Sequence, residues 1–433
     1  MEIIMLLKKQ KRFSLKFFMV GIPLLVVPAL QQEAWATGAS IPNSNPQLSV
    51  IIDGGYIASS RPSDEYALPG FQLGEEAELA SSGFQINEAE LNIQSNIDPY
   101  WFGNLTVGMH QHGNHTEFDL EEAFIRTLAL SQALPQVLPE GLSLTAGRFY
   151  SGIGYLNHHH RHQWDFADVP LVYRAMFNNQ YRDDGLQILW VAPTTFFCEL
   201  GAEAFPGRFF PASGSGNRLG SASLFAHIGD DIGLNQSWQL GASYLYTKPN
   251  QRVAILPGLE LEEGHSHDHE HGHQYHHDYE FSGHGNTIGL DAVWKWAPTG
   301  NAQNQHITLQ GEIFRRHEQG RLLIAGETGE ATLHQYGAYV QGVYLFRPKW
   351  RVGLRYDRLG SHNHAENHDI LHETNLASHG HHPHQATAMI DYSPSEFSRI
   401  RLQHNRDYSS ERLNRIVMLQ FIVSLGAHGA HAY

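Results

Sequence analysis

The chain has 433 residues, with 29 Lys and Arg against 44 Asp and Glu, 30 His and a single Cys. The formal net charge of −15 argues against nucleic acid as a partner, because phosphate binding needs a basic face. One Cys excludes an intrachain disulfide and any Cys-x-x-Cys metal or redox motif.

The N-terminus predicts a secretory signal peptide over residues 1–36. Basic residues between Lys8 and Lys16 precede an apolar run over 17–30, and the small-x-small pattern Ala34-Trp35-Ala36 follows. The alternative is a retained anchor helix, but the run is short for a bilayer span. Cleavage near Ala36 leaves a mature chain, 37–433, with a formal charge of −18, which favours a cation as partner.

The mature chain shows no long helical periodicity. Apolar and polar residues alternate instead in segments of about ten residues, the pattern of a transmembrane β-strand. The clearest segment runs from Val417 to Leu425. We predict an all-β fold, a transmembrane antiparallel β-barrel of about 16 strands. The strands are expected at 48–59, 83–96, 100–112, 117–131, 142–150, 184–193, 195–205, 219–229, 237–247, 284–296, 305–318, 333–346, 350–360, 385–393, 397–406 and 413–426.

The connections between these strands alternate in length. Short turns such as 97–99 and 347–349 are expected in the periplasm, together with both termini. The expected outer loops are longer: 60–82, 151–183, 206–218, 248–283, 319–332 and 361–384. This regularity places the barrel in the bacterial outer membrane, in contact with lipid and lipopolysaccharide. Tyr and Trp near strand ends, such as Trp101 and Trp350, suit the two aromatic girdles.

The third outer loop, 151–183, is expected to carry a short helix. Asp168 can cap its N-terminus, with Pro170 in the first turn. Val169, Leu171, Val172 and Met176 would give the helix an apolar side, which the loop could bury by folding into the barrel as a constriction. The alternative is a lid packed over the pore on neighbouring loops.

Three segments carry a family resemblance. GRFYSGIGYLN (147–157), WDFADVPL (164–171) and DGLQILWV (184–191) resemble the phosphate-selective porins. The C-terminal LQFIVSLGAHGAHAY (419–433) resembles porins or receptors regulated by zinc. The resemblance implies a sixteen-stranded homotrimer with a constricting third loop; the residues themselves leave monomer and trimer open. Basic side chains are associated with phosphate selectivity in that family. We do not expect that selectivity here, because the chain is acidic and its lumen-side arginines are opposed by glutamates; the arginines are Arg126, Arg355, Arg399 and Arg401, and the glutamates are Glu88, Glu90, Glu122 and Glu312.

The histidines gather in the outer loops. Three of them, His110, His112 and His115, flank the second loop. Neutral imidazole without thiolate suits Zn, Cu or Ni, and His-x-His spacing in an extended chain suggests several loosely held ions. A hydrophilic surface tract is the alternative reading of any one such loop. The expected metal ligands are His158, His159, His160, His162, His265, His267, His269, His271, His273, His276, His277, His362, His364, His368, His372, His379, His381, His382 and His384.

The expected function is therefore that of a porin that binds zinc, or else copper or nickel, and admits it through a water-filled lumen. The alternatives are a surface metal buffer or adhesin without transport, and a TonB-dependent type of receptor, for which the chain is too short to supply both a larger barrel and a plug. No enzyme motif such as GxSxG or HExxH occurs. The expected pore-lining residues are Glu88, Glu90, Glu122, Arg126, Glu312 and Arg355.

A pH dependence follows if the histidines hold the metal. Imidazoles titrate near pH 6.5, so they release metal when they are protonated at lower pH. In planar bilayers, the purified protein should conduct cations preferentially. Micromolar Zn²⁺ should alter that current at about pH 7.5 but not at about pH 5. Currents that Zn²⁺ leaves unchanged at both pH values would contradict gating by metal.

Overall fold

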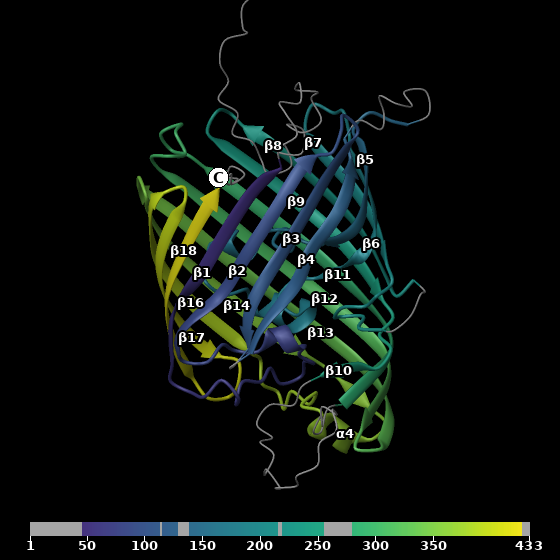
Figure 1. Cartoon of the computed structure of the whole chain (residues 1–433). Coiled ribbons are helices and arrows are strands. Elements are labelled where there is room, and N and C mark those ends of the chain that lie inside the picture. Colours follow the sequence, from purple (N-terminus) through teal and green to yellow (C-terminus); the bar gives the residue numbers. More distant parts are fainter. Residues whose placement is uncertain (1–45, 113–114, 129–137, 215–218, 255–278, 427–433) are drawn as a thin grey trace, which may run out of the picture. The chain divides into compact units, whose positions relative to one another are not determined.

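The computed structural model describes residues 46–112, 115–128, 138–214, 219–254 and 279–426. The predicted signal peptide, the residues 255–278 of the fifth outer loop and the C-terminal residues 427–433 lie outside them. The described chain forms one antiparallel sheet that closes on itself, because β1 pairs with β2 on one side and with β18 on the other (Figure 1). The fold is a transmembrane β-barrel.

Sixteen long strands build the wall and confirm the predicted set one for one. They are β1 (Gln47–Ser59), β2 (Gly83–Asn96), β3 (Trp101–His112), β4 (His115–Thr127), β5 (Leu142–Tyr150), β6 (Arg182–Val191), β7 (Phe197–Phe205), β8 (Ser221–Ile232), β9 (Gln236–Thr247), β11 (Tyr279–Trp296), β12 (His306–Ile324), β13 (Glu327–Arg347), β14 (Trp350–Ser361), β16 (His384–Ser395), β17 (Ser398–Tyr408) and β18 (Asn414–Gly426). The shorter elements are β10 (Arg252–Ala254), β15 (His364–Ala365), the helices α3 (Leu171–Phe177) and α4 (His368–Glu373), and the 3-10 turns η1 (Glu75–Ala77) and η2 (Arg161–Gln163).

Alternation along each strand separates an apolar outside from a polar inside. On β14, Leu354 and Tyr356 are 69% and 44% exposed, whereas Arg355 and Asp357 between them are 3% and 0% exposed. This is the arrangement expected when lipid surrounds a barrel whose lumen is polar. No helix of the described residues is long and apolar enough to cross a membrane.

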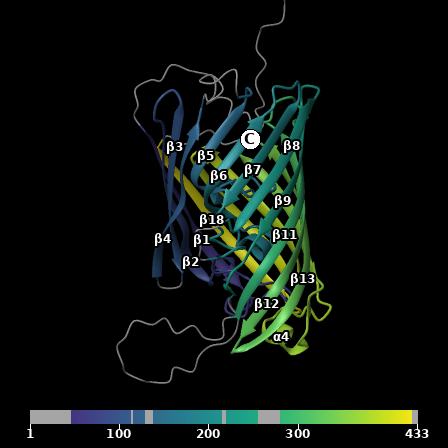
Figure 2. The same ribbon diagram turned by 90° about the vertical axis from the view of Figure 1, so that its right-hand side faces the viewer.

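The two rims of the barrel differ. Gln47 and Gly426 begin and end the wall at one rim, the terminal rim, where β13 and β14 are joined by a tight turn. The described long connections lie at the opposite, distal rim, which also carries α4 (Figures 1 and 2).

One predicted outer loop is wrong. Residues 319–332 do not form a loop, because β12 runs to Ile324 and β13 starts at Glu327. The turn between them has positive φ at Ala325 and Gly326, which suits a two-residue hairpin. The two strands extend this far because Leu322 and Leu333 are buried with residues of α4 in a second, smaller apolar core.

The third loop (151–181) folds into the lumen, as predicted for a constriction, and does not form a lid over the pore. α3 packs on β13 and β14, and all seven of its residues are buried. The main hydrophobic core of the described chain lies here, between the loop and inward side chains of the wall such as Phe205 and Phe314. The loop therefore fills one side of the lumen.

The expected N-cap of this helix is wrong. Pro170 occupies the N-cap position, and the Leu171 N–H donates to the Asp357 carboxylate on β14 at 3.0 Å. Asp168 instead accepts a hydrogen bond from the Arg355 guanidinium at 2.9 Å. Asp357 on the barrel wall, rather than Asp168 in the loop, therefore accepts the first N–H of the helix. Asp168 instead attaches the loop to the wall through Arg355.

Replacing Arg355 by Met should loosen the third loop. The change leaves the buried carboxylates of Asp168 and Asp357 without their cation, which costs about 3 kcal/mol of unfolding free energy. We expect a lower unfolding temperature in detergent, read from heat-modifiable electrophoresis, and faster tryptic cleavage at Arg174. Arg358→Met, on the exposed face of the same strand, is the matched control. Equal unfolding temperatures and cleavage rates for both variants would contradict the anchoring role.

Candidate metal centre in the barrel lumen

A group of carboxylates and imidazoles lies where the third loop meets strands β2, β3 and β4. Two overlapping sets of potential metal ligands occur among the described residues, each with its ligand atoms within 4.8 Å of one another. The first set is Glu88, His110 and Glu121, and the second is Glu90, Glu121 and His160. We call these five residues the luminal cluster.

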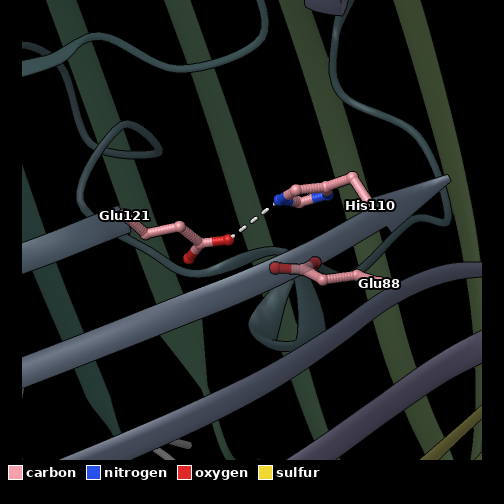
Figure 3. Close-up of side chains that lie close together, drawn as sticks. All are labelled: Glu88, His110 and Glu121. Atoms are coloured by element: carbon pink, nitrogen blue, oxygen red, sulfur yellow. Dashed lines mark hydrogen bonds and ion pairs between the residues drawn. The ribbon is translucent and has the colours of Figure 1, made fainter. Parts of the chain in front are cut away.

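The first set comes from three adjacent strands (Figure 3). His110 Nε2 lies 3.2 Å from Glu121 Oε1, and the Glu88 carboxylate lies beside them. Glu88 and Glu121 are buried, whereas the His110 side chain is 27% exposed. His110 thus gives the otherwise enclosed set an open side.

The second set joins the loop to the wall. His160 Nδ1 lies 3.5 Å from Glu90 Oε2 and 3.7 Å from Glu121 Oε2, while its Nε2 lies 3.2 Å from Glu122 Oε2. His162 Nδ1 also approaches Glu90 Oε2, at 3.2 Å. Glu90 Oε2 and His160 Nδ1 are buried and make no hydrogen bond to any described residue. Two such atoms facing each other are the kind of pair that a cation satisfies.

Two β-bulges aim these carboxylates into the lumen. The pairing of β3 with β4 shifts between Thr106 and Val107, so that Glu121 is the extra residue on β4. Leu120 on one side of the bulge and Ile125 on the other point outward, and both Glu121 and Glu122 point inward as a result. A similar shift opposite Asp53 and Gly54 leaves Asn87 as the extra residue on β2, next to Glu88. Bulges of this kind re-aim side chains at barrel rims.

Gly108 provides the space for the first set. It lies on β3 between the side chains of His110 and Glu121, and a Cβ at this position would come within 2.2 Å of Glu121 Oε1 and 2.7 Å of His110 Nε2. Both ligands therefore occupy the volume that any other residue would fill.

The electrostatics favour a positive charge at this point. Burial lowers the pKa of His160, but the carboxylates of Glu90, Glu121 and Glu122 raise it more, and the net pKa lies well above 6.5. An ion that binds His160 must therefore displace a proton. Mixed carboxylate and imidazole ligands without thiolate suit zinc, and also copper or nickel.

The structure brings together only some of the predicted ligands. Within the third loop, His160 and His162 reach the luminal cluster, while the rings of His158 and His159 lie tilted against each other with centroids 4.1 Å apart. The seventh outer loop, now 362–383, has paired rings, such as His372 and His379 at 4.6 Å, but no set of three ligands among its described residues. His265 to His277 lie outside the described residues. For these two loops the prediction of metal ligands stays a prediction.

The predicted pore-lining residues all face inward but differ in their surroundings. Glu88, Glu90 and Glu122 belong to or border the luminal cluster, and Arg126 donates to Thr145 at 3.1 Å on the same side of the lumen. Glu312 and Arg355 are covered by the third loop instead. Glu312 accepts hydrogen bonds from the backbone N–H groups of Tyr155 and Leu156 at 2.9 and 3.0 Å, and so anchors the loop.

Two residues of the cluster were missing from the predicted site. Glu121 falls on the outward face if the alternation of β4 is counted from Ile125, and His110 was noted only as flanking a loop. The signal for Glu121 is a change of phase, because Phe118 and Leu120 are even-numbered whereas Ala123 and Ile125 are odd-numbered. Such a change predicts one extra residue between the two runs.

Comparisons with known proteins support the fold. No family model matches the chain. A protein of Aquifex aeolicus (strain VF5), described as uncharacterized, is 28% identical over 417 residues, covering 90% of this chain and 80% of that protein. Among solved structures, the trimer form of the outer membrane protein OmpT of Vibrio cholerae aligns with a TM-score of 0.50 at 6% identity, over 89% of this chain and 100% of that one. This likeness shows the barrel fold alone.

Two other outer-membrane barrels align with similar TM-scores. The outer membrane channel DcaP of Acinetobacter baumannii aligns at 11% identity with a TM-score of 0.49, over 88% of this chain and 97% of that one. OprB of Pseudomonas putida, in a high-pH structure, aligns at 12% identity with a TM-score of 0.49, over 88% of this chain and 94% of that one. These two values carry no argument beyond the fold already described.

Filling the space at Gly108 should weaken metal binding without removing a ligand. In Gly108→Ala, the new methyl group displaces the Glu121 carboxylate from His110, and we expect at least a tenfold loss of affinity for Co²⁺ or Zn²⁺, within the range of about 10–100-fold for disturbed ligand support. Isothermal titration of the purified protein measures it. Gly103→Ala, on the same strand, is the control, because its Cβ would meet only the Ile97 side chain at 3.3 Å. Equal affinities for the two variants would exclude the first set as a metal site.

Proposed function

We propose that this protein is a bacterial outer-membrane channel that binds a divalent transition metal ion, zinc above all, at the luminal cluster and admits it to the periplasm. The observation that carries the proposal is the pair of buried atoms without hydrogen-bond partners, Glu90 Oε2 and His160 Nδ1, which face each other 3.5 Å apart beside Glu121. A buried carboxylate oxygen that makes no hydrogen bond is costly, and a bound cation removes that cost.

The wall supports the location in a membrane. A closed barrel leaves no edge of the sheet unpaired, which is a requirement for strands in lipid. Outward residues such as Leu186, Leu224 and Leu354 are 63%, 59% and 69% exposed, as expected for side chains that lipid and lipopolysaccharide cover. We place the terminal rim in the periplasm and the distal rim outside the cell. The trimer form of the Vibrio cholerae protein makes a homotrimer the assembly we propose.

The position of the cluster suits uptake. His110 lies two residues from the distal end of β3, and it leaves the cluster accessible from the side that we place outside the cell. The seventh outer loop lies at the same rim, where β10 and β11, the strands that flank the histidine-rich part of the fifth outer loop, also meet. In this proposal the two loops raise the local concentration of the ion, and the cluster then takes it up at the constriction formed by the third loop.

Zinc fits this ligand set better than magnesium or calcium. Imidazole is a good ligand for zinc, copper and nickel, whereas the hard cations prefer ligand sets made only of oxygen atoms. Each of the two sets mixes one imidazole with two carboxylates. Three protein ligands leave one position of a tetrahedral ion open for water, which suits exchange rather than permanent retention.

The second candidate function is a surface metal buffer without transport. The observation that favours it is the extent to which α3 and the wall bury each other, since every residue of that helix is buried inside the barrel. A buffer and a channel differ in one measurable property. Both bind zinc, but only the channel carries it from one side of a membrane to the other.

Zinc flux into liposomes tests the proposal. In proteoliposomes that enclose a zinc-sensitive dye, the native protein should admit zinc, and Glu121→Gln should lower the initial rate about tenfold, because it removes the residue shared by both ligand sets. Potassium conductance should change little in this variant. Glu411→Gln, an exposed acid at the same rim, is the control. Zinc binding without flux in the native protein would support the buffer, and an unaltered rate in Glu121→Gln would contradict the role of the cluster.

A further inference from the structure

A second group of ionisable side chains lies on another part of the wall, formed by β7, β8, β9 and β11. Glu199 pairs with His227, His227 with Gly241 and Gly241 with Asp291, so that the four residues form one row across the sheet. The side chains of the row face the lumen, because each residue of the row has a sequence neighbour that is exposed on the outer face of the barrel. These neighbours are Leu200, Ile228, Leu240 and Leu290. The luminal cluster contains none of these residues.

Asp291 lacks the partners that a buried carboxylate normally has. Its side chain is 0% exposed, and neither of its carboxylate oxygens makes a hydrogen bond to a described residue. The nearest oppositely charged candidate is the imidazole of His227, whose Nε2 lies 3.9 Å from Asp291 Oδ2. That separation is too long for a hydrogen bond. Glu312, next in the row on β12, is a further carboxyl group and offers no positive charge to Asp291.

His227 presents a nitrogen to this carboxylate. Its Nδ1 lies 3.1 Å from Glu199 Oε1, and a carboxylate accepts only, so Nδ1 carries the hydrogen. In the neutral imidazole, Nε2 then has a free lone pair, and Nε2 is buried and makes no hydrogen bond to a described residue. A histidine held by a carboxylate through one nitrogen, with the other directed at a ligand position, is the usual arrangement of a metal-binding histidine.

Gly241 allows this approach. A Cβ at Gly241 would come within 2.2 Å of Asp291 Oδ2 and 2.4 Å of Asp291 Oδ1, so the carboxylate lies directly over the glycine. Because Gly241 stands between His227 and Asp291 in the row, its missing side chain lets the two groups face each other across a whole strand. This is the same device that Gly108 provides in the luminal cluster.

We propose that His227 Nε2 and the Asp291 carboxylate are ligands of a second divalent cation, with Glu199 as the residue that positions His227. Two ligands of a tetrahedral zinc ion, each at about 2.0–2.1 Å, are about 3.3 Å apart, so the 3.9 Å separation needs only a small adjustment to hold an ion. Water completes the coordination. The site stands on its own geometry and rests on the proposed function only for the choice of zinc.

The third loop connects the two sites. The backbone N–H groups of Tyr155 and Leu156 in this loop donate to Glu312, the residue that pairs with Asp291 across β11 and β12. Further along the same loop, His160 contacts the luminal cluster. Residues 155–160 of the loop therefore reach from the wall beside Asp291 to the luminal cluster.

Anomalous diffraction at the zinc edge distinguishes the two sites. Crystals of the full-length protein grown with Zn²⁺ should show one peak beside His227 and Asp291, separate from any peak at the luminal cluster. In Asp291→Asn the peak beside His227 should be lost and the peak at the luminal cluster retained; in Glu121→Gln the reverse is expected. Asp230→Asn, an exposed acid on β8, is the matched control and should retain both peaks.

A stability measurement covers the case in which crystals of the variants are not obtained. Without metal, Asp291→Asn should unfold in detergent at a higher temperature than the native protein, because it removes a buried carboxylate whose two oxygens make no hydrogen bond to a described residue. Saturating Zn²⁺ should raise the unfolding temperature of Asp291→Asn less than that of Asp230→Asn. A peak only at the luminal cluster, or an equal zinc effect on the two variants, would overturn the second site and leave the proposed function standing. No peak at either place would overturn both.

Discussion

The position of His160, the ligand that the third loop contributes to the luminal cluster, depends on the buried charges that hold this loop inside the barrel. Arg355 bridges Asp168 on the loop and Asp357 on the wall, and Asp357 in turn accepts the N–H of Leu171 at the start of α3. Glu312 does the same for the backbone at Tyr155 and Leu156. Exposed ion pairs contribute about 0–1 kcal/mol, whereas breaking a buried pair costs about 3–5 kcal/mol, so this network outweighs the loop's tendency to move into water.

The network explains why the two sides of the lumen differ. Anchored on β12 to β17, the loop buries its apolar residues against Phe314 and Leu359 and leaves its His160 side facing β2 and β4. An apolar core and an ionic cluster are therefore separated by the width of one loop. A carboxylate close to such a core has little water to compensate it, which makes an imidazole or a cation the available partner.

Much of the fold was predictable, because period-two alternation is a direct consequence of strand geometry in lipid. The sixteen strands appear where the sequence placed them. Two predictions were wrong for the same reason. They relied on local sequence patterns, whereas contacts between residues far apart in the sequence decide both features. The residues 319–332 looked like a loop because the packing of Leu322 and Leu333 on α4 is not visible locally, and Asp168 looked like a helix cap because its partner Arg355 lies on a strand far along the chain.

The candidate site was predictable only in part, for the same reason. The third-loop histidines stand out by composition, but their acidic partners depend on two bulges and one glycine. The phase changes at Asn87 and Glu121 can be read from the sequence once a barrel is assumed. Gly108 cannot, because its role depends on which side chains lie on either side of it. Gly241 likewise makes room for the Asp291 carboxylate opposite His227, and the residues next to it in the sequence do not indicate this role.

Incomplete ligand sets are consistent with movement of an ion rather than storage. A closed tetrahedral site with four protein ligands would hold zinc so firmly that release would limit transport, whereas conduction requires binding that is strong enough for entry and weak enough for exit. The luminal cluster shares Glu121 between two sets of three ligands, and the row on β8 and β11 offers one imidazole and one carboxylate. Because neither group is complete, each depends on water or on a neighbouring imidazole for its last ligands. In the proposed channel, His160 of the third loop brings an imidazole to the luminal cluster, whereas the imidazole of the second group, His227, belongs to the wall itself.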